Sequence, residues 1–277
     1  MMLTVIPPVV DAAFLADHPH AVVADVRWYL DGRDGRAAYE AGHLPGAVWV
    51  DLDRQLAAHG LPATEGRHPF PTPDRFAAAM GALGIGNGSV VVAYDDTRGL
   101  TAGRRVVMLR MVGVDAAVLD GGLANWGGGV QQGWVEPTPS TFSAVPWPAD
   151  RLASADEAAA RAASGAAVLD ARAHERFTGA VTQIDPRPGP IPGARNAPWS
   201  AVLDSSGRIR PVGELRAHYE QLGINPDEPA IAYCGSGVSA CMNVVALEHA
   251  GLPPARLYVA SWSGWSADPE RPAELGG

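Results

Sequence analysis

Cysteine is scarce in this sequence: of its 277 residues only Cys234 and Cys241 are cysteines. Two cysteines cannot form a disulfide framework, and by themselves they cannot complete a zinc site. No pair of histidines stands near them at the spacing of metal ligands. We therefore expect a cytoplasmic protein of a reducing compartment that holds no metal and no other cofactor.

Positive charge and long apolar runs are lacking too. The 21 basic residues are outnumbered by 30 acidic ones, which gives a formal net charge of −9 and argues against a nucleic-acid partner. No stretch approaches the roughly 18 uninterrupted apolar residues of a membrane span. Residues 1–10 also lack the basic and then apolar pattern of a signal peptide. We expect neither nucleic acid nor a membrane as a partner.

What the sequence does contain is one series of motifs, used twice. Apolar runs that end in Asp-x-Arg, a Pro-Gly-Ala turn, a buried-strand pattern that ends in tyrosine and a later tryptophan recur after 139 to 147 residues. A repeat this long indicates duplicated domains, because solenoid units are much shorter. The marker residues are Asp25, Gly46, Tyr94 and Trp126 in the first copy and Asp170, Gly193, Tyr233 and Trp265 in the second.

The domains follow from this repeat. We predict an N-terminal domain over 1–133, a proline-rich linker over 134–151 and a C-terminal domain over 152–277. Apolar strand patterns at 89–94, 117–119 and 230–233 alternate with helical patterns such as 76–83 and 102–112. This alternation predicts α/β domains, each with a mostly parallel sheet flanked by helices. In such sheets ligands gather at the carboxyl ends of strands.

Cys234 stands at one of these strand ends. A loop of small residues follows it, and a helical pattern begins near Ser239. Strand, tight loop and helix would surround the sulfur with backbone N–H groups, helped by the freedom of Gly235 and Gly237 to adopt positive φ. Such a site favours a thiolate, which is the reactive form of cysteine. The competing interpretation is a buried structural cysteine, and we prefer it for Cys241.

These motifs together resemble the two-domain rhodanese-type sulfurtransferases over nearly the whole chain. The shared features are the two Asp-x-Arg strand ends, the turn 43–47, the segment 119–126 and a cysteine loop in the second half alone. The loop Cys-Gly-Ser-Gly-Val-Ser at 234–239 is most similar to that of 3-mercaptopyruvate sulfurtransferases. Thiosulfate enzymes of this family carry basic residues after the cysteine. The sequence departs from the family at Pro190, where histidine is frequent, and at Val259 and Ala260, where Asp-Gly is usual.

The resemblance implies that Cys234 takes a sulfur atom from 3-mercaptopyruvate as a persulfide and that pyruvate is released. A thiol, such as that of a thioredoxin-like protein, or cyanide then accepts the sulfur, which is two-step covalent catalysis. The resemblance also implies that the loop cradles the persulfide and that Ser236 relays a proton. The loop residues after the nucleophile are Gly235, Ser236, Gly237, Val238 and Ser239. Ser239 has an alternative role as a helix cap.

Further site residues are implied by the same resemblance. Arg176 and Arg187 match the pair that holds the substrate carboxylate, for which planar guanidinium groups are suited. The alternative for both is an ordinary surface position. Asp34 and His43 are expected near the second-half loop, across the domain cleft, as participants in proton transfer. His43 has the alternative of bracing the turn that follows it.

The first copy has Asp95 where the second has its cysteine. A carboxylate cannot carry a persulfide, so we expect this half to be catalytically silent. The pairs Asp25 with Arg27 and Asp170 with Arg172 are expected to be structural ion pairs at strand ends.

Three other functions stay open. The first is transfer from thiosulfate instead of 3-mercaptopyruvate, and the second is a non-catalytic sulfur carrier. The third is a cysteine phosphatase, whose loop also joins a strand to a helix. That chemistry needs an arginine six positions after the cysteine, where this chain has Ala240. The phosphatase is therefore the weakest of the three.

Overall fold

The computed structural model describes residues 6–182, 184–185 and 187–274, and the chain forms two compact units. The first unit comprises 1–57, 71–147 and 205–209, and the second comprises 58–70, 148–204 and 210–277. The predicted domain limits were 1–133, 134–151 and 152–277. They do not foresee that segment 58–70 belongs to the second unit and segment 205–209 to the first. As folding boundaries those limits stay a prediction. Residues 134–148 contain neither helix nor strand, in keeping with their many prolines.

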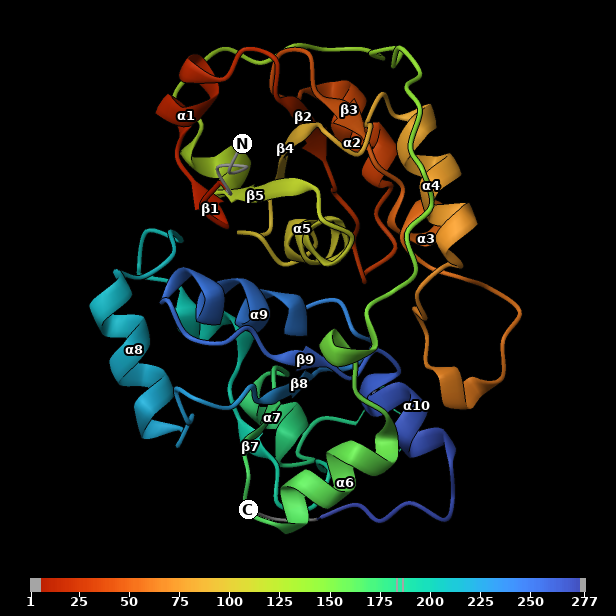
Figure 1. The fold of residues 1–277 in the computed structure, drawn as a ribbon, viewed down its shortest axis with the longest axis vertical. Coiled ribbons are helices and arrows are strands. Elements are labelled where there is room, and N and C mark those ends of the chain that lie inside the picture. Colours follow the sequence, from red (N-terminus) through yellow and green to blue (C-terminus); the bar gives the residue numbers. More distant parts are fainter. Residues whose placement is uncertain (1–5, 183, 186, 275–277) are drawn as a thin grey trace. The chain divides into compact units, whose positions relative to one another are not determined.

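The first unit is built on a parallel sheet (Figure 1). Within the described residues the strand order is β1-β5-β4-β2-β3, and every pair is parallel. The strands are β1 (Val9–Val10), β2 (Val22–Asp25), β3 (Val48–Trp49), β4 (Val90–Tyr94) and β5 (Asp115–Leu119). The helices are α1 (Ala12–Asp17), α2 (Gly35–Ala41), α3 (Leu52–Gln55), α4 (Pro73–Ala82), α5 (Ala102–Met111) and the 3₁₀-helix η2 (Gly122–Asn125).

The second unit repeats this plan with a parallel sheet of order β7-β6-β8-β9. The strands are β6 (Val168–Asp170), β7 (Arg195–Asn196), β8 (Ile231–Tyr233) and β9 (Arg256–Leu257). The α-helices are α6 (Ala155–Ala163), α7 (His174–Phe177), α8 (Val212–Gln221), α9 (Ala240–His249) and α10 (Ser261–Ala267). The 3₁₀-helices are η1 (Ala63–Glu65), η3 (Ala149–Arg151) and η4 (Trp199–Val202). Across the described residues, none of the helices has both the length and the apolar character that crossing a membrane requires.

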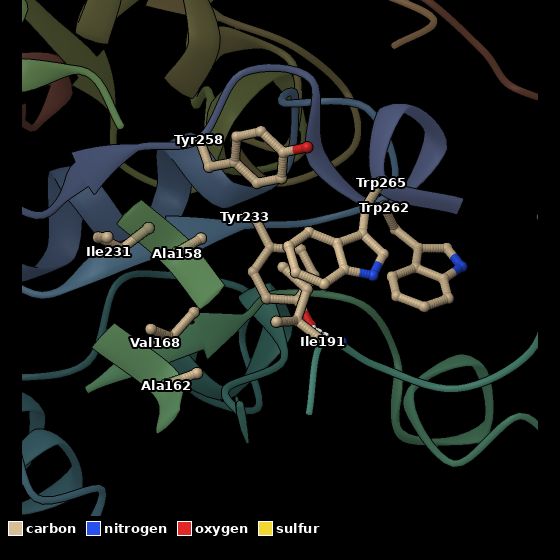
Figure 2. Close-up of a cluster of buried hydrophobic side chains, with 9 residues drawn as sticks. All are labelled: Ala158, Ala162, Val168, Ile191, Ile231, Tyr233, Tyr258, Trp262 and Trp265. Atoms are coloured by element: carbon tan, nitrogen blue, oxygen red, sulfur yellow. Dashed lines mark hydrogen bonds between the residues drawn. The ribbon is translucent and has the colours of Figure 1, made fainter. Parts of the chain in front are cut away.

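The core beneath the cysteine loop is aromatic. Figure 2 shows Trp262 and Trp265 of α10 lying close to Tyr233, with Tyr258 and Ile191 around them. Both tryptophans are buried. Large rings dominate the energetics of such a core, so α10 is firmly attached to the end of β8. The core of the first unit consists of smaller residues from the sheet and its neighbours, among them Val92, Tyr94, Ala117 and Leu119.

A tyrosine ends the central strand of each unit, and its hydroxyl makes the same kind of hydrogen bond in both. The hydroxyl of Tyr94 accepts a hydrogen bond from the backbone N–H of Leu44 at 2.9 Å. The hydroxyl of Tyr233 accepts one from the N–H of Ile191 at 3.1 Å, drawn as a dashed line in Figure 2. Burial holds the pKa of both tyrosines well above the ordinary value, so both hydroxyls stay neutral. Each tyrosine thus ties its strand end to the turn that the sequence repeat identified.

The two Asp-x-Arg motifs form buried ion pairs, as predicted. Arg27 contacts Asp25 at 2.7 Å, and Arg172 contacts Asp170 at the same distance. Arg27 also donates to the backbone carbonyl of Gly42, and Arg172 donates to that of Gly189. Both ion pairs are buried at strand ends and hydrogen-bonded to the backbone of their own unit, in agreement with a structural role.

Candidate active site

Cys234 lies directly after β8, and α9 begins six residues later at Ala240. The predicted order of strand, small-residue loop and helix is therefore confirmed. The cysteine is only 2% exposed. Its backbone N–H donates to the hydroxyl of Ser261 at 3.1 Å, and that hydroxyl donates in turn to the carbonyl of Tyr258. The nucleophile is fixed at its backbone from the neighbouring segment.

The first turn of α10 braces the loop further. Trp262 and Ser263 donate their backbone N–H groups to the carbonyls of Cys234 and Gly235, each at 2.9 Å. Ser261 has a φ of +53°, a left-handed conformation that is costly for a residue other than glycine. This segment falls where the sequence departs from its family at Val259 and Ala260, yet it still holds the cysteine loop.

Four amides of the cysteine loop are available to bind an anion. Among the described residues, the backbone N–H groups of Gly235, Ser236, Val238 and Ser239 donate no hydrogen bond. Buried N–H groups are nearly always paired in proteins, so a group of unpaired ones that follows a cysteine is suited to bind an anion. This is the setting that the sequence predicted for a thiolate or persulfide.

The first copy shows what such a loop does when it carries a carboxylate. The side chain of Asp95 accepts five hydrogen bonds at 2.8–2.9 Å, four of them from backbone N–H groups. The donors are the amides of Thr97, Gly99, Thr101 and Ala102 and the hydroxyl of Thr101. Asp95 therefore fills its own amide bowl, and the first unit has no place there for a sulfur anion.

The two glycines of the cysteine loop are needed for different reasons. Gly237 has a φ of +73°, as predicted. Gly235 does not have a positive φ, which corrects the prediction for this residue. A Cβ atom on Gly235 would lie 2.7 Å from an Nη atom of Arg176 and 3.0 Å from one of Arg67. Gly235 is thus the point where two guanidinium groups approach the loop.

A histidine from far away in the sequence reaches Ser236. The Nδ1 atom of His68 is hydrogen-bonded to the Oγ atom of Ser236 at 2.9 Å, and both side chains are buried. His68 belongs to the segment 58–70, which packs in the second unit. Ser236 was predicted to relay a proton, and His68 is the titratable group that stands beside it.

Close backbone packing fixes the segment that carries His68. A Cβ atom on Gly264 would lie 2.5 Å from the carbonyl oxygen of Thr64, and one on Gly66 would lie 2.4 Å from that of Ala260. The backbone N–H of Arg67 also donates to the hydroxyl of Ser263 at 3.0 Å. The same helix, α10, therefore positions both Cys234 and His68; in Figure 1 the orange loop with η1 lies beside it.

Arg176 and Arg67 form the positive wall of the site, and Asp185 joins them. Arg176 donates three hydrogen bonds to the carboxylate of Asp185, one from Nε at 3.0 Å and two from Nη2 at 2.6 and 2.8 Å, and Arg67 contacts it at 3.6 Å. Burial lowers the pKa of Arg67, and the nearby charge of Asp185 partly offsets this effect. The Nε atom of Arg67 is buried and has no hydrogen-bond partner among the described residues.

Arg187 makes no recorded contact with Asp185 among the described residues, and the predicted substrate-binding pair of Arg176 and Arg187 stays a prediction. Its guanidinium donates to four backbone carbonyls at the end of α10 and beyond, at 2.9–3.3 Å. Those bonds engage its Nε and both Nη atoms, so the guanidinium is held at the end of α10. Arg67, which the sequence analysis did not single out, occupies the position beside Arg176.

Asp34 and His43 have structural contacts inside the first unit. Asp34 is exposed at the N-cap of α2 and accepts from the N–H groups of Arg36 and Ala37. His43 is fully buried; its ring nitrogens lie 2.8 Å from the carbonyl of Leu44 and 3.1 Å from that of Gly133. These contacts agree with the bracing alternative for His43 and with helix capping for Asp34, and the catalytic role expected of both residues stays a prediction.

The remaining predicted residues lie as follows. Ser239 stands at the N-cap of α9, but its side chain makes no capping hydrogen bond there, so the capping alternative is wrong. Val238 is buried in the loop. Cys241 is buried inside α9, and its sulfur lies 3.4 Å from the carbonyl of Gly237, in agreement with a core thiol.

A pocket of about 480 Å³ lies beside Arg67 in the second unit. Arg67 and Asp185 form one part of its wall, and Ser263 of α10 forms another. Its remaining lining residues are Ala63, Gly66, Ile184 and Ala267. Arg67 therefore lines the pocket and also approaches the cysteine loop at Gly235.

Comparison with known proteins agrees with this geometry. The family described as Rhodanese-like domain matches residues 12–128 and 154–268. The 3-mercaptopyruvate sulfurtransferase of Escherichia coli K12 is 34% identical over 277 residues, covering 96% of this chain and 97% of that protein. A Mycobacterium tuberculosis protein named as a thiosulfate sulfurtransferase, SseB, is 40% identical over 261 residues, covering 92% and 90%. The solved structure of the Escherichia coli enzyme SseA superposes with a TM-score of 0.81 at 32% identity, covering 93% of this chain and 99% of that one.

Proposed function

Because this chain belongs to the family of rhodanese-like domain proteins and carries the domain twice, we propose that it is a sulfurtransferase that uses 3-mercaptopyruvate as its sulfur donor. The observation that carries the proposal is the set of unpaired N–H groups around Cys234, with two guanidinium groups beside them at Gly235. An anionic sulfur is stabilised by the first feature and an anionic donor by the second.

The first half-reaction transfers one sulfur atom. The Cys234 thiolate attacks the sulfur of 3-mercaptopyruvate, an S–S bond forms and the C–S bond of the donor breaks. The electron pair of that C–S bond leaves on carbon as the enolate of pyruvate. The proton of the donor thiol moves to this carbon, so that pyruvate departs and the cysteine is left as a persulfide anion. The loop amides stabilise this anion as an oxyanion hole stabilises oxygen.

Ser236 and His68 are the groups we assign to the proton transfer. Ser236 directly follows Gly235, and its hydroxyl is hydrogen-bonded to the imidazole of His68, a side chain that can accept and donate a proton. Together they can carry the proton from the donor sulfur to the enolate carbon. General acid–base catalysis of this kind contributes about 10²- to 10⁴-fold to a rate.

Arg176 and Arg67 are the groups we assign to the donor carboxylate. Nη atoms of both guanidinium groups lie next to Gly235, and Arg67 also lines the pocket. In the second half-reaction a thiolate, such as that of a thioredoxin-like protein, or cyanide attacks the outer sulfur and regenerates the Cys234 thiolate. We place this reaction in the cytoplasm, in keeping with the scarcity of cysteine.

Steady-state pyruvate release tests the proposal. Wild-type protein with 3-mercaptopyruvate and a dithiol acceptor should release pyruvate continuously, and Cys234→Ala should release none, whereas Cys241→Ala should retain activity. Intact mass spectrometry after donor treatment should show an adduct of about 32 Da, one sulfur atom. Efficient thiocyanate formation from thiosulfate without pyruvate release would favour the thiosulfate alternative. A stable adduct without turnover would favour a sulfur carrier.

A further inference from the structure

The arginine wall contains a carboxylate of its own. The side chain of Asp185 is only 2% exposed and is held by Arg176, by Arg67 at 3.6 Å and by Arg172 at 3.4 Å. Arg172 is already paired with Asp170 through bonds of 2.7–3.1 Å. Asp185 therefore offsets one of the two positive charges that Arg176 and Arg67 bring to the cysteine loop.

The net charge left for a donor is small. Arg67 and Arg176 carry two positive charges and Asp185 removes one. The loop residues Gly235 and Ser236 add none, and the chain contains no lysine that could. A donor with a single negative charge, such as a 2-oxo acid with a neutral thiol, would match this wall. A dianion such as thiosulfate would bring an unmatched negative charge close to a buried carboxylate.

Building on the proposed function, we propose that Asp185 determines donor specificity: it restricts the site to monoanionic sulfur donors and excludes thiosulfate. The Asp185 carboxylate is buried, so its repulsion of a second negative charge is weakly screened, and an interaction of about 1.4 kcal/mol changes relative binding tenfold. The chemistry itself is available to both donors. With thiosulfate the thiolate would attack the outer sulfur, the S–S bond would break and sulfite would leave with the electron pair. The choice between the two donors therefore depends on the net charge of Arg67, Arg176 and Asp185.

Thiocyanate formation from cyanide provides one readout for both donors. We expect Asp185→Asn to raise kcat/KM for thiosulfate by at least about tenfold, while kcat/KM for 3-mercaptopyruvate changes much less, because the removed charge opposes only the dianion strongly. Asp185→Glu keeps the charge and should keep the wild-type donor ratio. Glu157→Gln removes a different ion pair of the second unit, with Arg256, and should change neither constant.

The outcomes separate a specificity role from a structural one. If Asp185 merely braces Arg176, both donors lose activity in Asp185→Asn in the same proportion and their ratio stays at the wild-type value, which overturns the proposal. If Asp185→Asn does not fold, competitive inhibition of the wild type tests the same proposal. Pyruvate, a monoanion, should then inhibit competitively at least about tenfold more strongly than sulfate, a dianion. Equal inhibition by the two ions would overturn the proposal as well. Failure of the wild type to release pyruvate would instead refute the proposed function.

Discussion

His68 and Ser236 are hydrogen-bonded at 2.9 Å although 168 residues separate them in the sequence. The bond joins the loop that begins at Cys234 to the segment 58–70, which leaves the first half of the chain to pack in the second unit. Because both side chains are buried, the bond is shielded from competition with water. It places a titratable group beside the nucleophile loop.

We therefore expect His68→Ala to lower kcat for pyruvate release by about 10²- to 10³-fold. His68→Asn retains a hydrogen-bonding side chain but cannot titrate, so it should lose nearly as much. Ser236→Ala should be similarly impaired, and the double variant should be little worse than either single one because the two residues act together. His20→Asn, an exposed histidine of the first unit, serves as the control. Turnover of His68→Asn within threefold of wild type would remove His68 from the mechanism.

Arg176 and Arg187 should respond differently to the same change. Arg176→Lys loses the planar fork at the loop, so we expect KM for 3-mercaptopyruvate to rise about tenfold. Arg187→Lys loses donors to the four carbonyls beyond α10, so we expect KM to stay constant and the free energy of unfolding to fall by about 1–3 kcal/mol. Steady-state kinetics and urea denaturation of both variants check this. A raised KM in Arg187→Lys at unchanged stability would support the pair predicted from the sequence.

Asp95 should be essential for stability and dispensable for chemistry. Asp95→Ala removes the acceptor of five hydrogen bonds and leaves buried N–H groups unpaired. Each unpaired group costs about 1–3 kcal/mol, so the free energy of unfolding should fall by at least about 3 kcal/mol. Asp95→Asn keeps one acceptor oxygen, so its free energy of unfolding should lie between those of the wild type and Asp95→Ala. The exposed control Asp17→Asn should leave the free energy of unfolding unchanged. Wild-type stability of Asp95→Ala in urea denaturation would contradict this account of the first loop.

Two neighbouring arginines of α5 offer a matched pair. Arg104 and Arg105 are both fully buried, but Arg104 donates to the carbonyl of Leu56 at 2.7 Å. The three side-chain nitrogens of Arg105 have no partner among the described residues, and burial lowers its pKa to about 9. Arg104→Met should therefore destabilise the protein. Arg105→Met should stabilise it by about 1–3 kcal/mol, because an unpaired polar group is no longer buried. Equal destabilisation of both variants in thermal denaturation would show that Arg105 has a partner.

The duplicated fold and the nucleophile were accessible from the sequence because their signals are local. Strand and helix patterns have short periods, so residues 89–94, 102–112 and 230–233 were identified close to their observed limits. The same holds for the Asp-x-Arg pairs, whose partners stand two residues apart. Cys234 was identified because a strand, a glycine loop and a helix start follow one another along the chain.

The partners of the nucleophile were decided by tertiary structure alone. His68 and Arg67 lie in a segment without a periodic pattern, and no feature of 58–70 indicates that it packs against α10. Arg187 carries the residue type that a carboxylate site needs, but backbone carbonyls at the end of α10 take up its donors. Sequence determines which groups are available and what short-range structure they form. Which of them meet depends on backbone packing between distant segments, such as that at Gly66 and Gly264, because hydrogen bonds act over a few ångströms and residue spacing does not encode that proximity.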